Sequence, residues 1–244
     1  MDSLELVSFQ SPIFNTVQGE GSLIGTPSTF IRLQGCNQDC GWCDTKDSWV
    51  PGLGTVLSVP DVVRKLQEVG CLDHVVITGG NPMLQSEALV KLLSSAFFRD
   101  KHITVETNAY SYRAPLQSGG RHVNLLFPHH AGLLWSLSPK LHQNCVSTVR
   151  EYLSRKRREF NTREAAQVKL VVGTIEDITH AGELFVALRG ADDWGVRVPT
   201  SYILQPEFSK MRSLTKNPGF MDALRKLPVT VKVIPQAHKS MSLM

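Results

Sequence analysis

Seven short apolar runs recur along this chain, and segments with a helical period separate most of them. Strands that alternate with helices predict βα units and a parallel sheet. A series of this length indicates an α/β fold, built either as a complete or partial barrel or as a doubly wound sheet. The runs cover residues 28–35, 74–80, 102–108, 133–139, 167–173, 201–207 and 229–236.

Three segments between these runs have the apolar spacing of helices. Residues 59–70 place one apolar stripe on a helix for which Gly70 is the candidate end. Residues 86–98 show the same spacing, with Ser86 as the candidate N-cap, and residues 219–227 form the third segment. The stripe of the first segment consists of Val62, Val63, Leu66 and Val69.

The composition fits one domain of generous size or two small ones, and we predict a single domain over residues 1–244. The chain has five cysteines, an odd number with uneven spacing, which argues against a disulfide framework and favours a reducing cytoplasm. We find no signal peptide and no apolar stretch of about 20 residues that could cross a bilayer. We therefore expect a cytoplasmic protein that does not enter the membrane.

Three of the five cysteines lie in one loop with the spacing C-x3-C-x2-C: Cys36, Cys40 and Cys43. Structural zinc usually takes four protein ligands, and the nearest histidine, His74, falls in the next predicted strand. Three thiolates suit a [4Fe–4S] cluster in which one iron is left without a protein ligand. Zinc and ordinary thiols remain as alternatives, and we interpret Cys71 and Cys145 as small buried apolar residues.

The cysteine spacing, with Trp42 before the last cysteine, resembles the signature of the radical S-adenosylmethionine superfamily. The resemblance implies a partial (β/α) TIM-like barrel with the cluster loop after the first strand. It also implies that the open iron binds S-adenosylmethionine, whose cleavage yields a 5′-deoxyadenosyl radical that abstracts a substrate hydrogen. The residues that it assigns to S-adenosylmethionine are Trp42, Asp44, Gly79, Gly80, Asn81, Glu106, Asn108, Ser138, Pro139, Lys140 and Gln205.

These polar residues mostly follow predicted strands, which is where βα folds build their sites. Each motif alone would indicate no more than a turn. Gly79 and Gly80 lack a Cβ and so allow backbone to approach a ligand. Asn81 stands where the superfamily motif commonly has Glu, and its amide oxygen can accept a hydrogen bond but adds no charge.

Residues 14–36, FNTVQGEGSLIGTPSTFIRLQGC, resemble the N-terminus of the 7-carboxy-7-deazaguanine synthases, and residues 233–240, VIPQAHKS, resemble that family's closing segment. The resemblance extends from Phe14 to Lys239 except for residues 110–132 and 146–165. It implies ring contraction of 6-carboxy-5,6,7,8-tetrahydropterin to 7-carboxy-7-deazaguanine with loss of ammonia, in queuosine and deazapurine biosynthesis. It further implies Mg²⁺, a reductant such as flavodoxin or ferredoxin, and a homodimer.

The same resemblance assigns residues to the pterin and to Mg²⁺, while the radical leaves no side chain with an assigned catalytic role. Arg32 offers a planar, permanent cation to the substrate carboxylate. The hydroxyl of Thr45 suits Mg²⁺, which prefers few protein ligands beside substrate oxygens. The residues assigned to the substrate are Val17, Gln18, Gly19, Glu20, Arg32, Thr78 and His238.

Residues 149–167 are basic and helix-prone, and we predict a solvated helical insertion there. The net charge of +4 suits an anionic small molecule and does not require nucleic acid. Two alternatives stay open: a glycyl-radical-enzyme activase or other radical S-adenosylmethionine enzyme, and a zinc-stabilised module that binds RNA. The module would use the run of four basic residues at 155–158.

Overall fold

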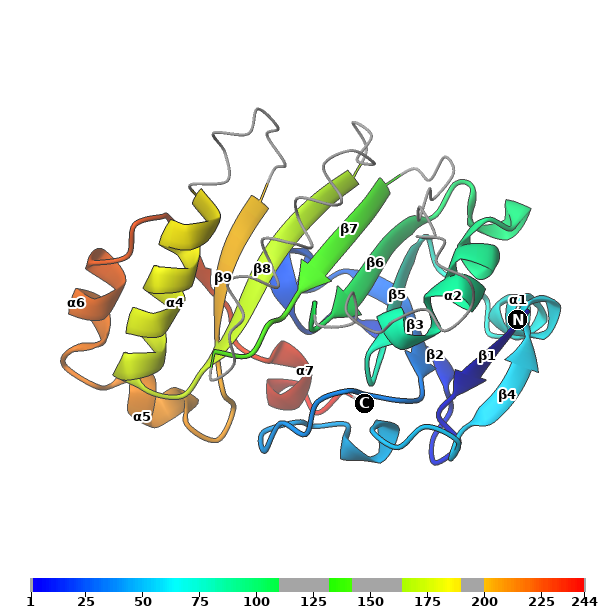
Figure 1. Cartoon of the computed structure of the whole chain (residues 1–244), viewed down its shortest axis with the longest axis horizontal. Coiled ribbons are helices and arrows are strands. Elements are labelled where there is room, and N and C mark those ends of the chain that lie inside the picture. The colour runs from blue at the N-terminus through cyan, green and yellow to red at the C-terminus, as the bar shows by residue number, and fades with distance from the viewer. Residues whose placement is uncertain (1, 110–131, 142–163, 190–199, 244) are drawn as a thin grey trace, which may run out of the picture.

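The computed structural model describes residues 2–109, 132–141, 164–189 and 200–243. Its strands form one sheet in the order β10-β9-β8-β7-β6-β5-β3-β1-β4, with β2 paired to β3 (Figure 1). Seven of these strands, each parallel to its neighbours in the series, correspond to the seven predicted runs. They are β3 (Pro27–Leu33), β5 (His74–Gly79), β6 (His102–Thr107), β7 (Gly132–Leu137), β8 (Glu164–Val172), β9 (Thr200–Pro206) and β10 (Val231–Val233).

The order of the parallel strands distinguishes the two predicted architectures. From β3 to β10 each parallel strand pairs with the next one along the chain, so the order never reverses. A doubly wound sheet needs such a reversal, whereas right-handed crossovers in a single direction curve the sheet towards a barrel. The sheet stays open between its end strands β10 and β4, which confirms the partial (β/α) barrel.

Three antiparallel strands at one end of the sheet were not predicted: β1 (Ser3–Leu6), β2 (Ile13–Val17) and β4 (Thr55–Ser58). Each has four or five residues, too few for a reliable period. Strand β1 joins β3 to β4, and β2 pairs with the other end of β3. The cluster loop therefore follows the third strand in chain order, which is the first strand of the parallel series.

The helix α1 (Val59–Glu68) matches its predicted segment, and its Asp61 backbone N–H donates to the Ser58 Oγ at 3.2 Å. The helix α2 (Ser86–Leu93) begins at Ser86, so the prediction of Ser86 as an N-cap was wrong. A 3₁₀ turn, η3 (Pro82–Gln85), leads directly into α2. The cap belongs to this turn, where the Asn81 side chain accepts from the Met83 N–H.

The 15-residue helix α4 (Ile175–Arg189) was missed, although residues 174–177 have the spacing of a capping box. Its start is capped by Thr174 Oγ1, which accepts from Asp177 N, and by the Asp177 carboxylate, which accepts from Thr174 N. The helices α5 (Met211–Thr215), α6 (Phe220–Arg225) and α7 (Ala237–Ser240) follow, and α6 confirms the segment predicted at 219–227. Helix α4 packs against β8 and α6.

Two sequence predictions, the helical insertion at 149–167 and the role of Cys145, involve residues outside the described ranges. Residues 164–167 of the expected helical insertion begin strand β8, so that end of the prediction was wrong. The remaining part from 149 to 163, and Cys145, lie outside the described residues. The insertion and the single domain over 1–244 stay predictions.

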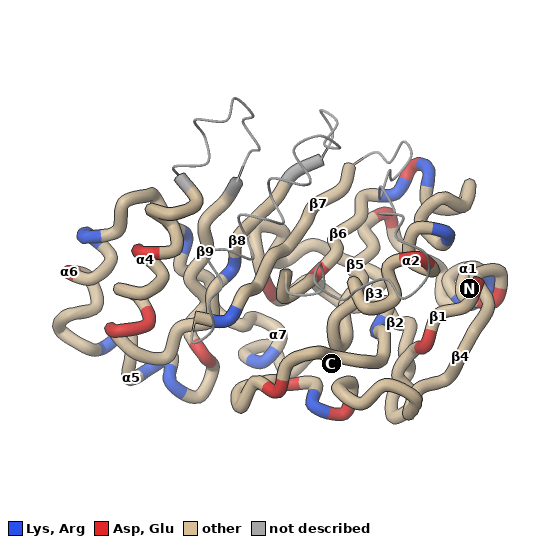
Figure 2. Tube along the Cα trace, in the orientation of Figure 1, with Lys and Arg blue, Asp and Glu red and all other residues tan. Residues whose placement is uncertain are grey.

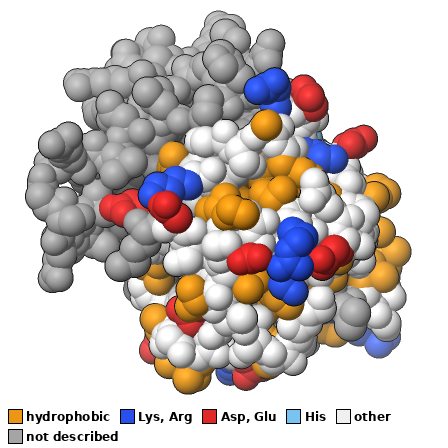
Figure 3. Space-filling model, turned by 90° about the vertical axis from the view of Figure 1, so that its right-hand side faces the viewer, with side chains coloured by type: hydrophobic (Ala, Val, Ile, Leu, Met, Phe, Trp, Pro, Cys, Tyr) orange, Lys and Arg blue, Asp and Glu red, His pale blue; other side chains and the backbone are white. Residues whose placement is uncertain are grey.

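In Figure 1 the carboxyl ends of the parallel strands point towards α7 and towards the segment that follows β3. Charged positions lie on strands of the sheet as well as on the outer elements (Figure 2). On the side of the molecule shown in Figure 3, acidic and basic side chains are interspersed with hydrophobic ones. None of the helices in the described ranges is long and apolar enough to cross a membrane.

Candidate active site

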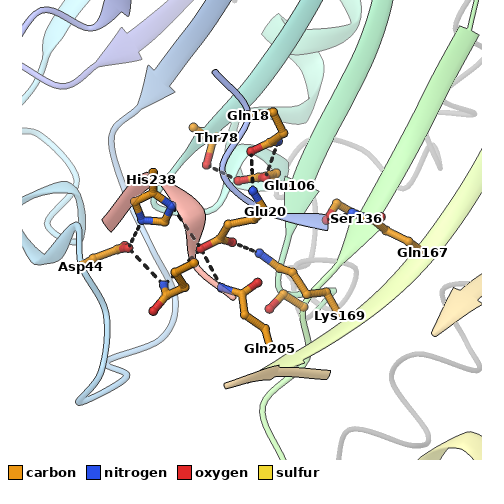
Figure 4. Close-up of polar contacts among 12 residues, drawn as sticks. Gln18, Glu20, Asp44, Thr78, Glu106, Ser136, Gln167, Lys169, Gln205 and His238 are labelled. Carbon is orange, nitrogen blue, oxygen red and sulfur yellow. Dashed lines mark hydrogen bonds and ion pairs between the residues drawn. The ribbon is translucent and has the colours of Figure 1, made fainter. Parts of the chain in front are cut away.

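The parallel strands carry polar side chains on one face and apolar side chains on the other. Strand β6, for example, alternates Thr104 and Glu106 with the fully buried Ile103 and Val105. Parallel strands covered on both sides normally read as continuous apolar runs, so a polar face marks a lined site. The polar face comprises His74, Thr78, Thr104, Glu106, Ser136, Gln167, Lys169 and Gln205, of which Figure 4 shows most.

A buried ion pair between Lys169 and Glu20 lies at the centre of this site (Figure 4). Burial opposes both charges, but the charge of Lys169 and its hydrogen bond hold the pKa of Glu20 below its usual value. The charges of Glu20 and Glu106 likewise hold the pKa of Lys169 above its usual value despite burial. The carboxylate of Glu20 also accepts from Gln205 Nε2 at 2.7 Å and from Gln236 Nε2 at 3.1 Å.

The C-terminal segment closes one side of the site. The Ala237 N–H donates to the Gly19 carbonyl at 2.9 Å, and a Cβ at Gly19 would lie 2.6 Å from the His238 Cβ. Gly19 is therefore needed for the approach of the C-terminal segment. His238 Nε2 lies 3.3 Å from the Asp44 carboxylate, and Lys239 Nζ lies 3.5 Å from it. Burial opposes the charge of Asp44, yet these two neighbours hold its pKa well below its usual range.

Glu106 joins residues that were predicted to bind different ligands. It accepts from Gln18 Nε2 at 3.2 Å and from Thr78 Oγ1 at 2.8 Å (Figure 4). Gln18 and Thr78 were assigned to the substrate, whereas Glu106 was assigned to S-adenosylmethionine. Asp44 and Gln205 were likewise assigned to S-adenosylmethionine, but their partners His238 and Glu20 were assigned to the substrate.

Arg32 lies at the edge of this group of polar residues. Its guanidinium lies over the Phe14 ring, 4.9 Å from the ring centroid, and donates to Gln10 Oε1 at 2.9 Å. Burial lowers the pKa of Arg32, although the charges of Asp44 and Glu106 counteract this effect. A side chain of this kind offers a partly desolvated cation to an incoming carboxylate.

The sequence reasoning missed several residues of the site: Lys169, Gln236, Gln167, Ser136 and Asn37. Lys169 and Gln167 could have been found from alternation, since the predicted strand QVKLVVG places them on the same face. Gln167 Nε2 donates to Ser136 Oγ at 2.8 Å, and its Oε1 accepts from the Ser22 N–H at 2.8 Å. Gln236 could have been found only from the matched closing segment.

The cysteine loop is shaped by hydrogen bonds to its own return segment. The N–H groups of Gly35 and Cys36 donate to the carbonyls of Ser48 and Trp49, each at 2.8 Å. Gln34 is buried and its Nε2 donates to two carbonyls of the same segment, at 2.8 and 2.9 Å. Trp49 Nε1 donates to Cys43 Sγ at 3.3 Å. The four cysteines that the structure describes are free, and three of them lie on this loop.

The surroundings of the cysteine thiols disfavour their charged thiolate form, so thiolates in this loop need a cation as a partner. Burial raises the pKa of Cys36 and of Cys40, and the charges of the neighbouring cysteines raise both further. Lys140 faces the same group, since Cys36, Cys40 and Cys43 all act on its charge, while burial lowers its pKa. These residues fit a cationic iron–sulfur cluster. Cys71, outside the loop, is half-buried against the core rather than fully buried as predicted.

A second group of possible metal ligands lies beside the loop. The ligand atoms of Glu20, Asp44 and His238 all lie within 4.8 Å of one another, so this group could hold a metal ion. Thr45, predicted to bind Mg²⁺, places its Oγ1 3.7 Å from Cys43 Sγ.

Gly79 and Gly80 lie against the backbone of the strand and loop that lead to the cysteines. A Cβ at Gly79 would be 2.1 Å from the Leu33 carbonyl oxygen, and one at Gly80 would be 2.1 Å from that of Gly35. Protein backbone fills the space that a Cβ would take, so the fold itself requires glycine at both positions, and their contact with a ligand stays a prediction. Farther along, Ser138 N donates to the Thr107 carbonyl at 2.8 Å, and Lys140 Nζ lies 3.4 Å from Ser138 Oγ.

Comparison with known proteins agrees with this geometry. Residues 30–126 match the model of the radical SAM superfamily. A 7-carboxy-7-deazaguanine synthase from Rhodopirellula baltica is 33% identical over 196 residues, which cover 75% of this chain and 69% of that protein. The chain belongs to the 7-carboxy-7-deazaguanine synthase family.

Other members of the 7-carboxy-7-deazaguanine synthase family match different shares of the chain. The protein from Aquifex aeolicus is 27% identical over 235 residues, which cover 95% of this chain and 92% of that protein. The protein from Halobacterium salinarum is 45% identical over 106 residues, 43% of this chain and 40% of that protein. The crystal structure of QueE from Escherichia coli, 24% identical, has a TM-score of 0.59 with 97% of this chain covered. That likeness supports the fold.

Membership of the 7-carboxy-7-deazaguanine synthase family makes the chain a radical S-adenosylmethionine enzyme. A [4Fe–4S] cluster and S-adenosylmethionine follow from that family, and the free, half-buried cysteines fit the cluster. The activase and the zinc-stabilised RNA-binding module are thereby disfavoured. The basic run at 155–158, on which the module depends, lies outside the described residues.

Proposed function

We propose that this chain converts 6-carboxy-5,6,7,8-tetrahydropterin to 7-carboxy-7-deazaguanine with release of ammonia. The observation that carries the proposal is the polar face of the open barrel, centred on Glu20 and Lys169, beside a loop of three free cysteines. The names of the relatives give the product, 7-carboxy-7-deazaguanine. A small polar heterocycle with a carboxylate matches a site rich in amide, carboxylate and cationic groups.

Cys36, Cys40 and Cys43 would hold the cluster, and Trp49 would donate to the sulfur of Cys43. The cluster and S-adenosylmethionine supply the 5′-deoxyadenosyl radical that abstracts a substrate hydrogen. The residues proposed for S-adenosylmethionine are Trp42, Gly79, Gly80, Asn108, Ser138, Pro139 and Lys140. Lys140, half-buried beside the thiols, offsets part of the negative charge that the loop gathers.

Glu20 would accept from the N–H edge of the pterin. A carboxylate offers about four acceptor positions, and three of those of Glu20 are filled by Lys169, Gln205 and Gln236. The remaining one is left for a substrate donor. Asp44, Glu106 and Gln205 bond to this group, so we assign them to the pterin end of the site rather than to S-adenosylmethionine.

The other proposed substrate residues surround Glu20: Val17, Gln18, Gly19, Arg32, Thr78 and His238. Arg32 would pair with the substrate carboxylate, and Gln18 and Thr78 are held in place by Glu106. His238, 22% exposed, would help to exclude water as the C-terminal segment covers Gly19. Mg²⁺ would bind the Thr45 hydroxyl and polarise substrate oxygens, with Asp44 as a neighbouring carboxylate.

The proposed substrate is a small molecule. A flavodoxin or ferredoxin would reduce the cluster, and two copies would form a homodimer in the cytoplasm. Nucleic acid is not needed for this reaction.

Anaerobic turnover tests the proposal. Reconstituted protein with S-adenosylmethionine, dithionite and the carboxytetrahydropterin should form 7-carboxy-7-deazaguanine and ammonia, faster with Mg²⁺ and without net use of S-adenosylmethionine. Replacing Arg32 by Lys should raise KM for the pterin, since the planar fork is lost. The matched control Arg64→Lys, on the outer helix α1, should leave the KM for the pterin unchanged. A loaded cluster that forms 5′-deoxyadenosine but no deazaguanine would contradict the proposed reaction.

A further inference from the structure

Three asparagines connect the cysteine loop to the ends of two strands. Asn37 lies on the loop between Cys36 and Cys40, Asn81 follows β5, and Asn108 follows β6. Asn81 Nδ2 donates to Asn108 Oδ1 at 2.7 Å and to Asn37 Oδ1 at 3.1 Å. Asn108 Nδ2 donates to the same Asn37 oxygen at 2.8 Å. The amide of Asn37 thus joins the loop to both strands.

The orientation of the Asn81 amide follows from its other two partners. A backbone N–H can only donate, so the Asn81 atom that faces Met83 N at 3.4 Å must be the oxygen. Thr107 Oγ1 donates to the same oxygen at 2.9 Å, while it accepts from the Ala109 N–H at 3.1 Å. The Asn81 NH₂ group must therefore point to Asn37 and Asn108.

These contacts leave Asn81 without acceptor capacity for a ligand. An amide oxygen has two lone pairs, and here Thr107 and Met83 occupy both. The side chain is fully buried, and its NH₂ group can only donate. The ammonium group of S-adenosylmethionine needs an acceptor, so the expected contact between Asn81 and that ammonium has no free oxygen to use.

We propose that Asn81 is a positioning residue that holds Asn37, and with it the loop between Cys36 and Cys40, in the shape that receives the cluster. The ammonium of S-adenosylmethionine then depends on other groups. The inference depends on the proposed function only for the identity of the cofactor, because the clamp already exists in the protein without it. The neutral NH₂ donor is the feature that the commoner Glu cannot supply at this position.

Hydrogen exchange of the cofactor-free protein tests the clamp directly. Asn81→Asp keeps the oxygen that accepts from Thr107 but replaces the NH₂ group, so the amides of residues 36–43 should exchange about tenfold faster. Asn37→Ala should have the same effect without placing a charge in the interior, which covers the case in which Asn81→Asp fails to fold. The matched control Asn15→Ala removes an asparagine whose partners Val69, Gly70 and Thr29 all lie outside the loop, and should leave these amides unchanged.

Cluster spectroscopy provides the second readout. After reconstitution, Asn81→Asp and Asn37→Ala should lose iron to a chelator several-fold faster than the unaltered protein and Asn15→Ala. Asn81→Glu should also loosen the loop and should not tighten binding of S-adenosylmethionine. Unchanged loop exchange together with tighter binding in Asn81→Glu would overturn the inference and restore Asn81 as a ligand. If the clamp is confirmed but no deazaguanine forms, the proposed function fails and this inference stands.

Discussion

Lys169 on β8 and Glu20, which follows β2, form an ion pair whose side chains are only 7% and 16% exposed. Glu106 and Asp44 add their charges near the same ammonium group. Removing one partner of a buried pair leaves an uncompensated charge, whereas removing both does not. The pair therefore supports both the fold and the carboxylate that the proposed pterin would meet.

Replacing Lys169 by Met should lower the free energy of unfolding by about 3–5 kcal/mol, because Glu20 is left charged and buried. Urea denaturation at pH 7 measures the change. The double variant Lys169→Met/Glu20→Gln should recover much of the loss, since it leaves no isolated charge. A double variant as unstable as the sum of the two single variants would refute a direct coupling.

Acid should destabilise the protein through His74. This buried ring lies 2.6 Å from Ser28 Oγ and 2.8 Å from Thr104 Oγ1, and burial with the nearby His102 lowers its pKa to about 4. A histidine with a lowered folded pKa stabilises the fold fully above its unfolded value of about 6.5. That contribution is lost as the pH falls from about 6.5 to about 4, and amounts to about 3 kcal/mol.

Urea denaturation at pH 7 and at pH 4.5 checks the role of His74. The unaltered protein should lose more stability between these values than His74→Gln, which cannot take up a proton. Because carboxylates titrate in both proteins, only the difference between them reports on His74. Equal losses in the two proteins would rule the histidine out as the acid-sensitive group.

Replacing Cys40 by Ala should abolish the cluster, because two thiolates cannot hold three irons of a cubane. Iron content and visible absorbance after anaerobic reconstitution measure it. The matched control is Cys71→Ala, since Cys71 is a free thiol outside this loop, and its Sγ bonds to the Leu72 carbonyl at 3.4 Å. Full iron content in Cys40→Ala would disprove the assignment of the loop.

Replacing Gly80 by Ala should destabilise the protein by about 1–3 kcal/mol, a typical effect of overpacking. The new Cβ would lie 2.1 Å from the Gly35 carbonyl oxygen and 2.8 Å from that of Ser48, and backbone cannot move aside easily. Thermal unfolding of the cofactor-free protein measures the effect. Gly41→Ala in the cysteine loop is the control, because nothing lies within 4 Å of a Cβ there. Equal melting temperatures for the two variants would contradict this reading of Gly80.

The sequence by itself determined those features that depend only on residues close together in the chain. Cys36, Cys40 and Cys43 belong to one loop, and the apolar pattern of each strand covers only a few residues. Both can therefore be predicted from a short stretch of sequence. The alternation of side chains along residues 102–108 and 167–173 would also have been enough to predict the polar face of the sheet, including Lys169. Strand order was constrained too, because consecutive parallel strands tend to be neighbours.

Only the tertiary structure decided which of these residues meet. Lys169 and Glu20 are 149 positions apart, and their contact depends on the register of β8 and on the path of the chain after β2. The Ala237 N–H of the closing segment donates to the carbonyl of Gly19, which follows β2, although these residues lie near opposite ends of the sequence. For Asn81 the sequence named a motif position, but the hydrogen bonds that occupy its amide come from β6 and the cysteine loop. Contacts of this kind are set by packing between distant segments, which local spacing does not encode.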